Sequence, residues 1–160
     1  MILKEPIKIL LADDKKEICD SLEDNLLIHL QKFGLTSKDV VFVKSYTEHA
    51  YDHGCKAVAD GFKPDICIFD LVFNGYTGVD LYKYIVQRLG KKVNLCIYTG
   101  VEKKYEKRKE AEFLASETND MITIIPKPDI SEVLLWFERL LENNYNLIKQ
   151  IDEKDPFDLL

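Results

Sequence analysis

The chain has 160 residues and a formal net charge of −6, and its 46% hydrophobic and 31% charged residues are typical of a globular protein. This length is enough for one domain with a well-developed core and is short for two ordinary domains. The sequence disfavours a membrane protein, because no apolar run approaches ~18 residues, and the negative charge disfavours general binding to nucleic acid.

Short apolar runs alternate with polar segments of helical length, which predicts alternating strands and helices. The first helical segment has the clearest pattern, with Ile18, Leu22 and Leu26 at helical spacing. The expected strands cover residues 7–12, 40–43, 64–70, 93–98 and 121–126. The expected helices cover residues 15–33, 48–60, 79–89, 103–112 and 129–140.

Two of the expected helices carry more detailed predictions. The segment 103–112 is charged nearly all round, so we expect a helix that faces solvent and packs through a narrow stripe. The residues expected in this stripe are Val101, Tyr105 and Leu114. In the last helix, Asp129 stands three residues before Glu132, which predicts a capping box at its start.

Polar side chains stand at the ends of four of the apolar runs. They are Asp13 and Asp14, Asp70, Thr99 and Lys127. Strands joined by crossover helices form a parallel sheet, and all their carboxyl ends then lie at one edge. We therefore expect three carboxylates, a hydroxyl and an ammonium group to meet at the edge where open α/β sheets bind ligands.

These residue types are suited to phosphoryl transfer. A carboxylate such as that of Asp70 can attack a phosphoryl donor and form an acyl phosphate, but the two anions repel each other. A magnesium ion held by Asp13, Asp14 and Asp70 would neutralise this repulsion. The remaining phosphoryl oxygens would then be bound by Lys127 and by the hydroxyl of Thr99.

The order and spacing of these residues resemble the receiver domains of two-component response regulators, over residues 6–142. The resemblance rests on four motifs: Asp13-Asp14, the loop from Asp70 to Gly78, Tyr98-Thr99-Gly100 and Pro126-Lys127-Pro128. It implies an α/β fold of the flavodoxin-like, doubly wound (βα)5 type. In that fold five parallel strands follow the order 2-1-3-4-5 and helices cover both faces.

The resemblance also implies a role for each site residue. Asp70 would be the phosphoacceptor, Asp14 a direct Mg²⁺ ligand, and Asp13 a ligand directly or through water. Val72 would contribute its backbone carbonyl to the metal. Thr99 would be the switch hydroxyl and Lys127 the cation that pairs with the phosphoryl group, and the peptide bond before Pro128 is expected to be cis.

The function implied is a phosphorylation-activated receiver in the cytoplasm, where the absence of a recognisable secretory signal also places the chain. The expected phosphoryl donor is a sensor histidine kinase or a histidine phosphotransfer protein. The downstream partner would be another protein or an effector domain outside this chain, and a second copy of the chain is a further candidate. Such a receiver is not an enzyme in the usual sense, since it catalyses only its own phosphorylation and dephosphorylation.

Several departures from the usual receiver pattern favour an alternative, a docking module that acts without phosphorylation. Phe73-Asn74 replaces the usual Met-Pro, and Ile124 stands where many receivers carry a switching aromatic residue. The connection from Thr99 to Lys127 is also longer than usual, which we interpret as a specificity feature. A third hypothesis is a magnesium-dependent phosphatase. It is disfavoured because such an enzyme would need an aspartate two residues after Asp70 as acid or base, and this position is Val72.

Simpler interpretations exist for the individual residues. Asp13 and Asp14 can cap a helix, Asp70 can end a strand and Lys127 can be a surface cation. Three further features have both a functional and a structural reading. His49, His53 and Cys55 are potential zinc ligands, and the basic run 103–109 could bind an acidic partner, but we favour a solvated helix face for both. The thiols of Cys67 and Cys96 could form a redox switch, but we favour neighbouring reduced core thiols.

The chain is expected to divide into a receiver domain at 1–142 and a C-terminal helix extension with an acidic tail at 143–160. Tyr145, Ile148 and Ile151 continue the apolar spacing of the last helix, so the helix either runs on as a pairing surface or frays into the tail. We recognise no output domain in the sequence.

Overall fold

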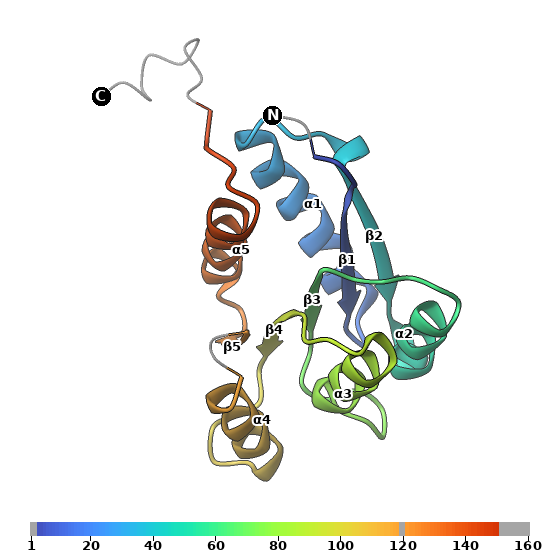
Figure 1. The fold of residues 1–160 in the computed structure, drawn as a ribbon. Helices are drawn as coiled ribbons and strands as arrows, with labels where there is room; N and C mark the ends of the chain where they lie inside the picture. Colours follow the sequence, from blue (N-terminus) through green and yellow to red (C-terminus); the bar gives the residue numbers. More distant parts are fainter. Residues whose placement is uncertain (1–2, 119–120, 151–160) are drawn as a thin grey trace.

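The fold is an α/β sandwich around one parallel sheet, as the computed structural model of residues 3–118 and 121–150 shows (Figure 1). The five strands lie in the order β2-β1-β3-β4-β5 and pair in parallel, which confirms the expected 2-1-3-4-5 sheet. The strands are β1 (Ile7–Ala12), β2 (Val40–Ser45), β3 (Ile66–Phe69), β4 (Asn94–Thr99) and β5 (Ile122–Pro126).

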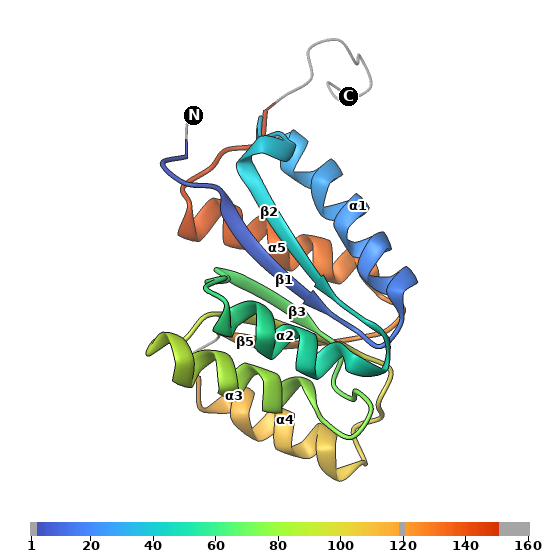
Figure 2. The ribbon, with the colours of Figure 1, turned by 90° about the vertical axis from the view of Figure 1, so that its right-hand side faces the viewer.

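Five α-helices cover the two faces of the sheet. They are α1 (Lys16–Lys32), α2 (Ala50–Ala59), α3 (Gly78–Leu89), α4 (Glu106–Ser116) and α5 (Ile130–Asn144), and short 3-10 turns at Ser37–Asp39 and Thr47–His49 flank β2. Helices α1 and α5 pack on one face, and α2, α3 and α4 on the other, as Figures 1 and 2 show together. This arrangement is the doubly wound architecture that the resemblance to receiver domains implies.

The apolar core has two parts because successive strand residues face opposite sides of the sheet. Cys96 belongs to the part under α1 and α5, whereas Cys67 belongs to the part under α2 and α3. Both thiols are buried, and burial raises their pKa values, as expected for reduced core residues. They are not neighbours, however, because the register pairs Cys96 with Ile68 and places Cys67 on the other face.

The ends of α3 and α5 show how local chemistry sets helix boundaries. The hydroxyl of Thr77 accepts a hydrogen bond from the Asp80 amide, and the Asp80 carboxylate accepts one from the Thr77 amide, which completes a capping box for α3. The capping box expected at Asp129 is not formed. Instead, the Asp129 carboxylate accepts a hydrogen bond from the Ser131 hydroxyl.

Helix α4 begins later than residues 103–112 predict. Tyr105 precedes its first turn and is 53% exposed, so the expected packing role of Tyr105 is wrong. Val101 and Leu114 do pack partly against the core, as expected. Within α4 itself the buried residues are Arg108 and Ala111.

The segment after α5 leaves the helix axis. Helix α5 ends at Asn144, Asn146 adopts a left-handed backbone conformation, and Leu147 is buried. The Gln150 amide donates a hydrogen bond to the Lys32 carbonyl of α1, at 2.7 Å. The helical continuation expected through Ile148 is therefore not observed, and Ile151 lies outside the described residues.

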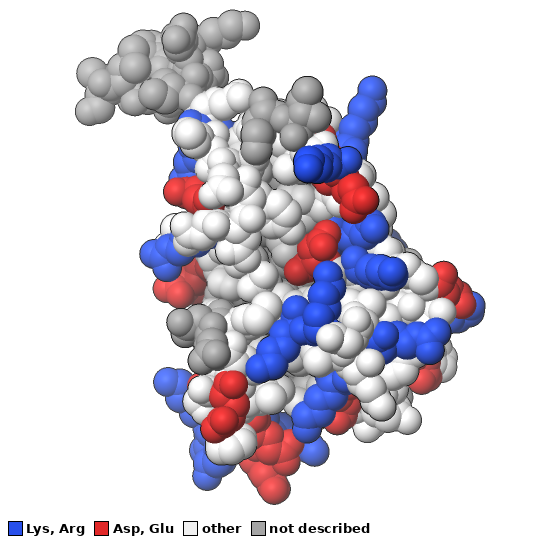
Figure 3. All heavy atoms as spheres, in the orientation of Figure 1, with Lys and Arg blue, Asp and Glu red and all other residues white. Residues whose placement is uncertain are grey.

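The surface carries both signs of charge. On the face shown in Figure 3, Lys and Arg side chains are interspersed with Asp and Glu side chains. In the described residues, no helix is long and apolar enough to cross a membrane.

Candidate functional site

Three carboxylates meet at the carboxyl edge of the sheet. Asp13 and Asp14 follow β1, Asp70 follows β3, and the register pairs the strand ends Ala12 and Phe69. One oxygen from each of the three carboxylates lies within 4.8 Å of the other two. The parallel sheet therefore brings these residues together as the strand-end pattern predicts.

Lys127 reaches this cluster from the end of β5. Its Nζ lies 2.8 Å from Asp13 Oδ2 and 3.3 Å from Asp70 Oδ2, so one ammonium group bridges two of the carboxylates. The backbone holds Lys127 in place, because its amide donates a hydrogen bond to the carbonyl of Thr99. The Lys127-Pro128 peptide bond is cis, as expected.

The burial of Asp13 and the charges around it shift the pKa values of the groups in this cluster. Asp13 is only 2% exposed, and burial raises its pKa to about 6, while the hydrogen bond from Lys127 lowers it and the charge of Asp70 raises it further. Burial also disfavours the charged form of Lys127, but the hydrogen bond to Asp13 and the charge of Asp70 outweigh it and raise the Lys127 pKa. The cluster thus contains three carboxylates and one ammonium group.

Thr99 ends β4 and is fully buried. Its hydroxyl oxygen accepts a hydrogen bond from the amide of Val101 at 3.1 Å. This places a hydroxyl at the same sheet edge as the carboxylates, on the strand next to β3. Because the hydroxyl oxygen is the acceptor in this bond, the hydroxyl hydrogen can be donated to another group.

The loop after Asp70 is closed by its own backbone. The Phe73 amide donates to the Tyr76 carbonyl at 2.8 Å, Val72 forms an isolated bridge with Thr77, and the ring of Phe73 is buried. Phe73 therefore fills the core below a loop that lacks the usual Met-Pro. Val72, the expected source of a metal-binding carbonyl, lies in this loop and is 42% exposed.

Gly78 closes the loop against Asp70. Its amide donates a hydrogen bond to the Leu71 carbonyl at 2.8 Å. A Cβ at this position would overlap the backbone carbonyl oxygen of Asp70. A glycine eight residues after the aspartate is thus required by the close approach of α3 to the end of β3.

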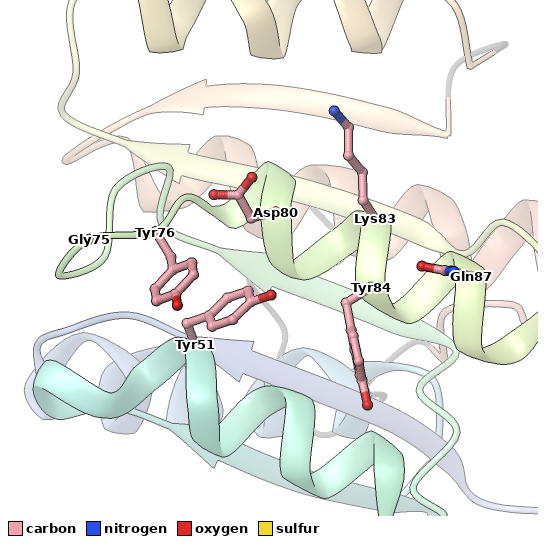
Figure 4. Close-up of a pocket in the computed structure, with 7 residues that line it drawn as sticks. All are labelled: Tyr51, Gly75, Tyr76, Asp80, Lys83, Tyr84 and Gln87. Atoms are coloured by element: carbon pink, nitrogen blue, oxygen red, sulfur yellow. The ribbon is translucent and has the colours of Figure 1, made fainter.

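An aromatic pair that the sequence pattern did not reveal braces the same loop. Tyr76 stacks on Tyr51 of α2, with ring centroids 3.9 Å apart and an angle of 4° between the planes. The two rings lie at one end of a pocket of about 470 Å³ between α2 and α3 (Figure 4). Asp80, Lys83, Tyr84 and Gln87 line the rest of this pocket.

The alternative site residues do not assemble into a site. Among the described residues, Asp13, Asp14 and Asp70 form the one group of three or more clustered metal-ligand side chains, so the potential zinc site at His49, His53 and Cys55 is not formed. The basic run 103–109 is exposed as expected, except at Arg108. Sequence reasoning missed this burial because one of its two partners, the carbonyl of Val101, lies outside helix α4.

Comparison with known proteins identifies the class of the fold. No family model and no curated protein sequence matches the chain. A response regulator receiver protein from Sinorhizobium medicae matches with a TM-score of 0.62 and 16% identity, over 87% of this chain and 97% of its own. The phosphorylated cyanobacterial phytochrome response regulator RcpA matches with a TM-score of 0.58 and 13% identity, over 86% of this chain and 92% of its own.

A third solved structure, the BeF3-activated DrrB receiver domain, matches with a TM-score of 0.57 and 16% identity. It covers 86% of this chain and 99% of its own. At this level of identity the similarity concerns the fold. The chain has the fold of response-regulator receiver domains, and the flavodoxin-like prediction is confirmed.

Proposed function

We propose that the protein is a receiver that accepts a phosphoryl group on Asp70 from a histidine kinase or a histidine phosphotransfer protein. Phosphorylation would then change its binding to a downstream partner in two-component signalling. The observation that carries this proposal is the meeting of Asp13, Asp14 and Asp70 with the ammonium group of Lys127. The receiver fold of the three solved structures supports it.

The donor set fits Mg²⁺. Magnesium prefers hard oxygen ligands, and Asp13, Asp14 and Asp70 supply one carboxylate oxygen each, with the Val72 carbonyl proposed as a further ligand. Three carboxylates meet here, and the ammonium group of Lys127 contacts two of them, Asp13 and Asp70. When bound, the metal ion would offset the negative charge that develops between the carboxylate and the phosphoryl group.

The residues of the chain would perform the transfer mainly by position and charge. A carboxylate oxygen of Asp70 attacks phosphorus, the phosphorus–nitrogen bond of the donor phosphohistidine breaks, and its electron pair stays on the imidazole nitrogen. Lys127 already lies 3.3 Å from Asp70 and would pair with a phosphoryl oxygen. Thr99 would donate its hydroxyl hydrogen to another.

The central experiment is incubation of the protein with Mg²⁺ and acetyl phosphate, followed by intact-mass measurement. We expect a gain of one phosphoryl group that disappears in Asp70→Asn and after chelation of the metal. Asp60→Asn is the matched control, because Asp60 is exposed and its contact is a surface ion pair with Lys56. A wild-type protein that stays unmodified at saturating donor would refute the proposal.

A second candidate function is docking without phosphorylation. It is favoured by the bridge from Lys127 to Asp13 and Asp70, which already stabilises the carboxylate cluster without a phosphoryl group. Ile124, which pairs with Ile97 in the sheet, also provides no aromatic switch. Partner binding that is the same in wild type, in Asp70→Asn and after removal of Mg²⁺ would favour this second function.

A further inference from the structure

Helix α4 holds an arginine in an unusual environment. The helix is charged over most of its surface, yet the side chain of Arg108 is only 6% exposed. A guanidinium group loses favourable hydration when it is buried, so it requires partners inside the protein. The contacts of Arg108 therefore identify what this side chain holds in place.

Arg108 binds one group on its own helix and one outside it. Nε donates a hydrogen bond to Glu112 Oε1 at 3.0 Å, one helical turn away, and Nη1 donates to the backbone carbonyl of Val101 at 2.8 Å. The planar guanidinium can make both bonds at once because its donors are held in a rigid fork. Glu112 thus orients the side chain, and Val101 is the residue that it binds outside the helix.

Val101 is held from two sides. Its carbonyl accepts the hydrogen bond from Arg108, and its amide donates one to the hydroxyl of Thr99. A continuous series of hydrogen bonds therefore runs from the buried hydroxyl of Thr99, through the backbone of Val101, to helix α4. Helix α4 has few apolar anchors, since Ala111 is its one buried apolar residue and Leu114 and Ala115 are only partly buried against the core.

We propose that Arg108 is a positioning residue that makes helix α4 move with the hydroxyl of Thr99. The proposal rests on the proposed function, in which that hydroxyl turns toward a phosphoryl group on Asp70. Such a turn displaces the Val101 amide, and the Val101 carbonyl then transmits the displacement to Arg108 and α4. The phosphorylated and unphosphorylated forms would therefore present different α4 surfaces to a partner.

The hydrogen bonds through Val101 connect the Thr99 hydroxyl to helix α4, and the neighbouring strand β5 provides no equivalent connection at Ile124. Ile124, on the strand next to β4, has an apolar side chain and pairs with Ile97. It cannot follow the Thr99 hydroxyl through a hydrogen bond. Arg108 instead reaches the turn after Thr99 from the helix side.

The test measures amide hydrogen exchange across residues 106–116, with and without Mg²⁺ and acetyl phosphate. In the wild type we expect phosphorylation to change exchange in α4 by about tenfold. In Arg108→Met we expect the same extent of phosphorylation and a change in α4 below about twofold. Lys109→Met is the matched control, because Lys109 is an exposed basic residue on the same helix, and it should respond like the wild type.

A second measurement tests the connection without any phosphoryl donor. A double-mutant cycle of Thr99→Val and Arg108→Met is read by exchange in α4, and we expect the two effects to be strongly non-additive. Arg108→Lys is included because it keeps the positive charge but cannot reproduce the fork of donors, and it should show an intermediate response. If Arg108→Met folds poorly, Arg108→Lys replaces it in the same measurements.

The outcomes separate the two proposals. If the wild type takes up no phosphate, the proposed function fails, while the cycle still decides whether Thr99 and α4 are connected. If the wild type is phosphorylated but α4 responds equally in Arg108→Met, the role of Arg108 is refuted. Additive effects in the cycle would refute it as well.

Discussion

Lys127 and Asp13 form a largely buried ion pair with 2.8 Å between Nζ and Oδ2, although 114 positions separate them in the chain. The side chain of Asp13 is 3% exposed and that of Lys127 is 21% exposed. Because the same ammonium group also contacts Asp70, it occupies part of the space in which a cation would bind. Lys127 and a metal ion would therefore compete for the negative charge of the same two carboxylates, Asp13 and Asp70.

This competition predicts that Lys127→Met binds Mg²⁺ more tightly than the wild type, by roughly tenfold, because a repelling charge is removed from the cluster. The same variant should lose much of its phosphorylation by acetyl phosphate, since the proposed partner of the phosphoryl oxygens is absent. Calorimetric titration with Mg²⁺ measures the first effect, and Lys16→Met, at an exposed position, is the control. Equal or weaker affinity in Lys127→Met would contradict the prediction.

Gly78→Ala should destabilise the protein by about 2 kcal/mol or more, because the new Cβ would overlap the Asp70 carbonyl and force α3 away from β3. Urea unfolding measures the change. Gly100→Ala is a suitable control, since a Cβ added there meets no atom within 4 Å. Similar unfolding free energies for the two variants would show that the approach at Gly78 is not as tight as the structure indicates.

The stacked pair of Tyr51 and Tyr76 should stabilise the loop after Asp70. Aromatic pairs in such geometry contribute about 1 kcal/mol beyond the burial of their area. A double-mutant cycle with Tyr51→Leu and Tyr76→Leu should show this coupling in the unfolding free energy. The cycle of Tyr84→Leu with Tyr76→Leu, in the same pocket, should be close to additive. A coupling near zero for the stacked pair would argue against its role.

Glu138 should make stability depend on pH. Its carboxylate is largely buried and contacts His29 and Lys32 of α1 and Lys149 of the segment after α5. Burial acts to raise the Glu138 pKa, but the hydrogen bonds from Lys149 and His29 outweigh it, so the pKa is lowered from 4.5. The stabilisation is thus present above that ordinary value and is lost as the pH falls through the lower pKa of the folded state.

Glu138→Gln should therefore cost about 2 kcal/mol of unfolding free energy at neutral pH, where the charged hydrogen bonds are intact. The difference from the wild type should shrink as the pH falls below the ordinary carboxyl pKa of 4.5. Denaturant unfolding at several pH values measures both effects. Glu132→Gln, at an exposed position on the same helix, should change little, and a constant difference between Glu138→Gln and wild type at all pH values would contradict the assignment.

The order of strands and helices and the convergence of Asp13, Asp14, Asp70 and Lys127 could be predicted from the sequence. Apolar runs and helical spacing are local signals, and parallel strands place all their carboxyl ends at one edge whatever the details of packing. The glycine eight residues after Asp70 was also visible, but its physical reason, the approach of α3 to the Asp70 carbonyl, required the structure.

Other features were decided only by tertiary structure. Three features depend on contacts between segments that no sequence periodicity relates. They are the burial of Arg108, the stacking of Tyr51 on Tyr76 and the turn of the chain after Asn144. Cys67 and Cys96 likewise looked like neighbours from their equal spacing to strand ends, but register and pleat place them on opposite faces of the sheet. Spacing along one segment reports which face a residue occupies, whereas the identity of its partner depends on how distant segments pack.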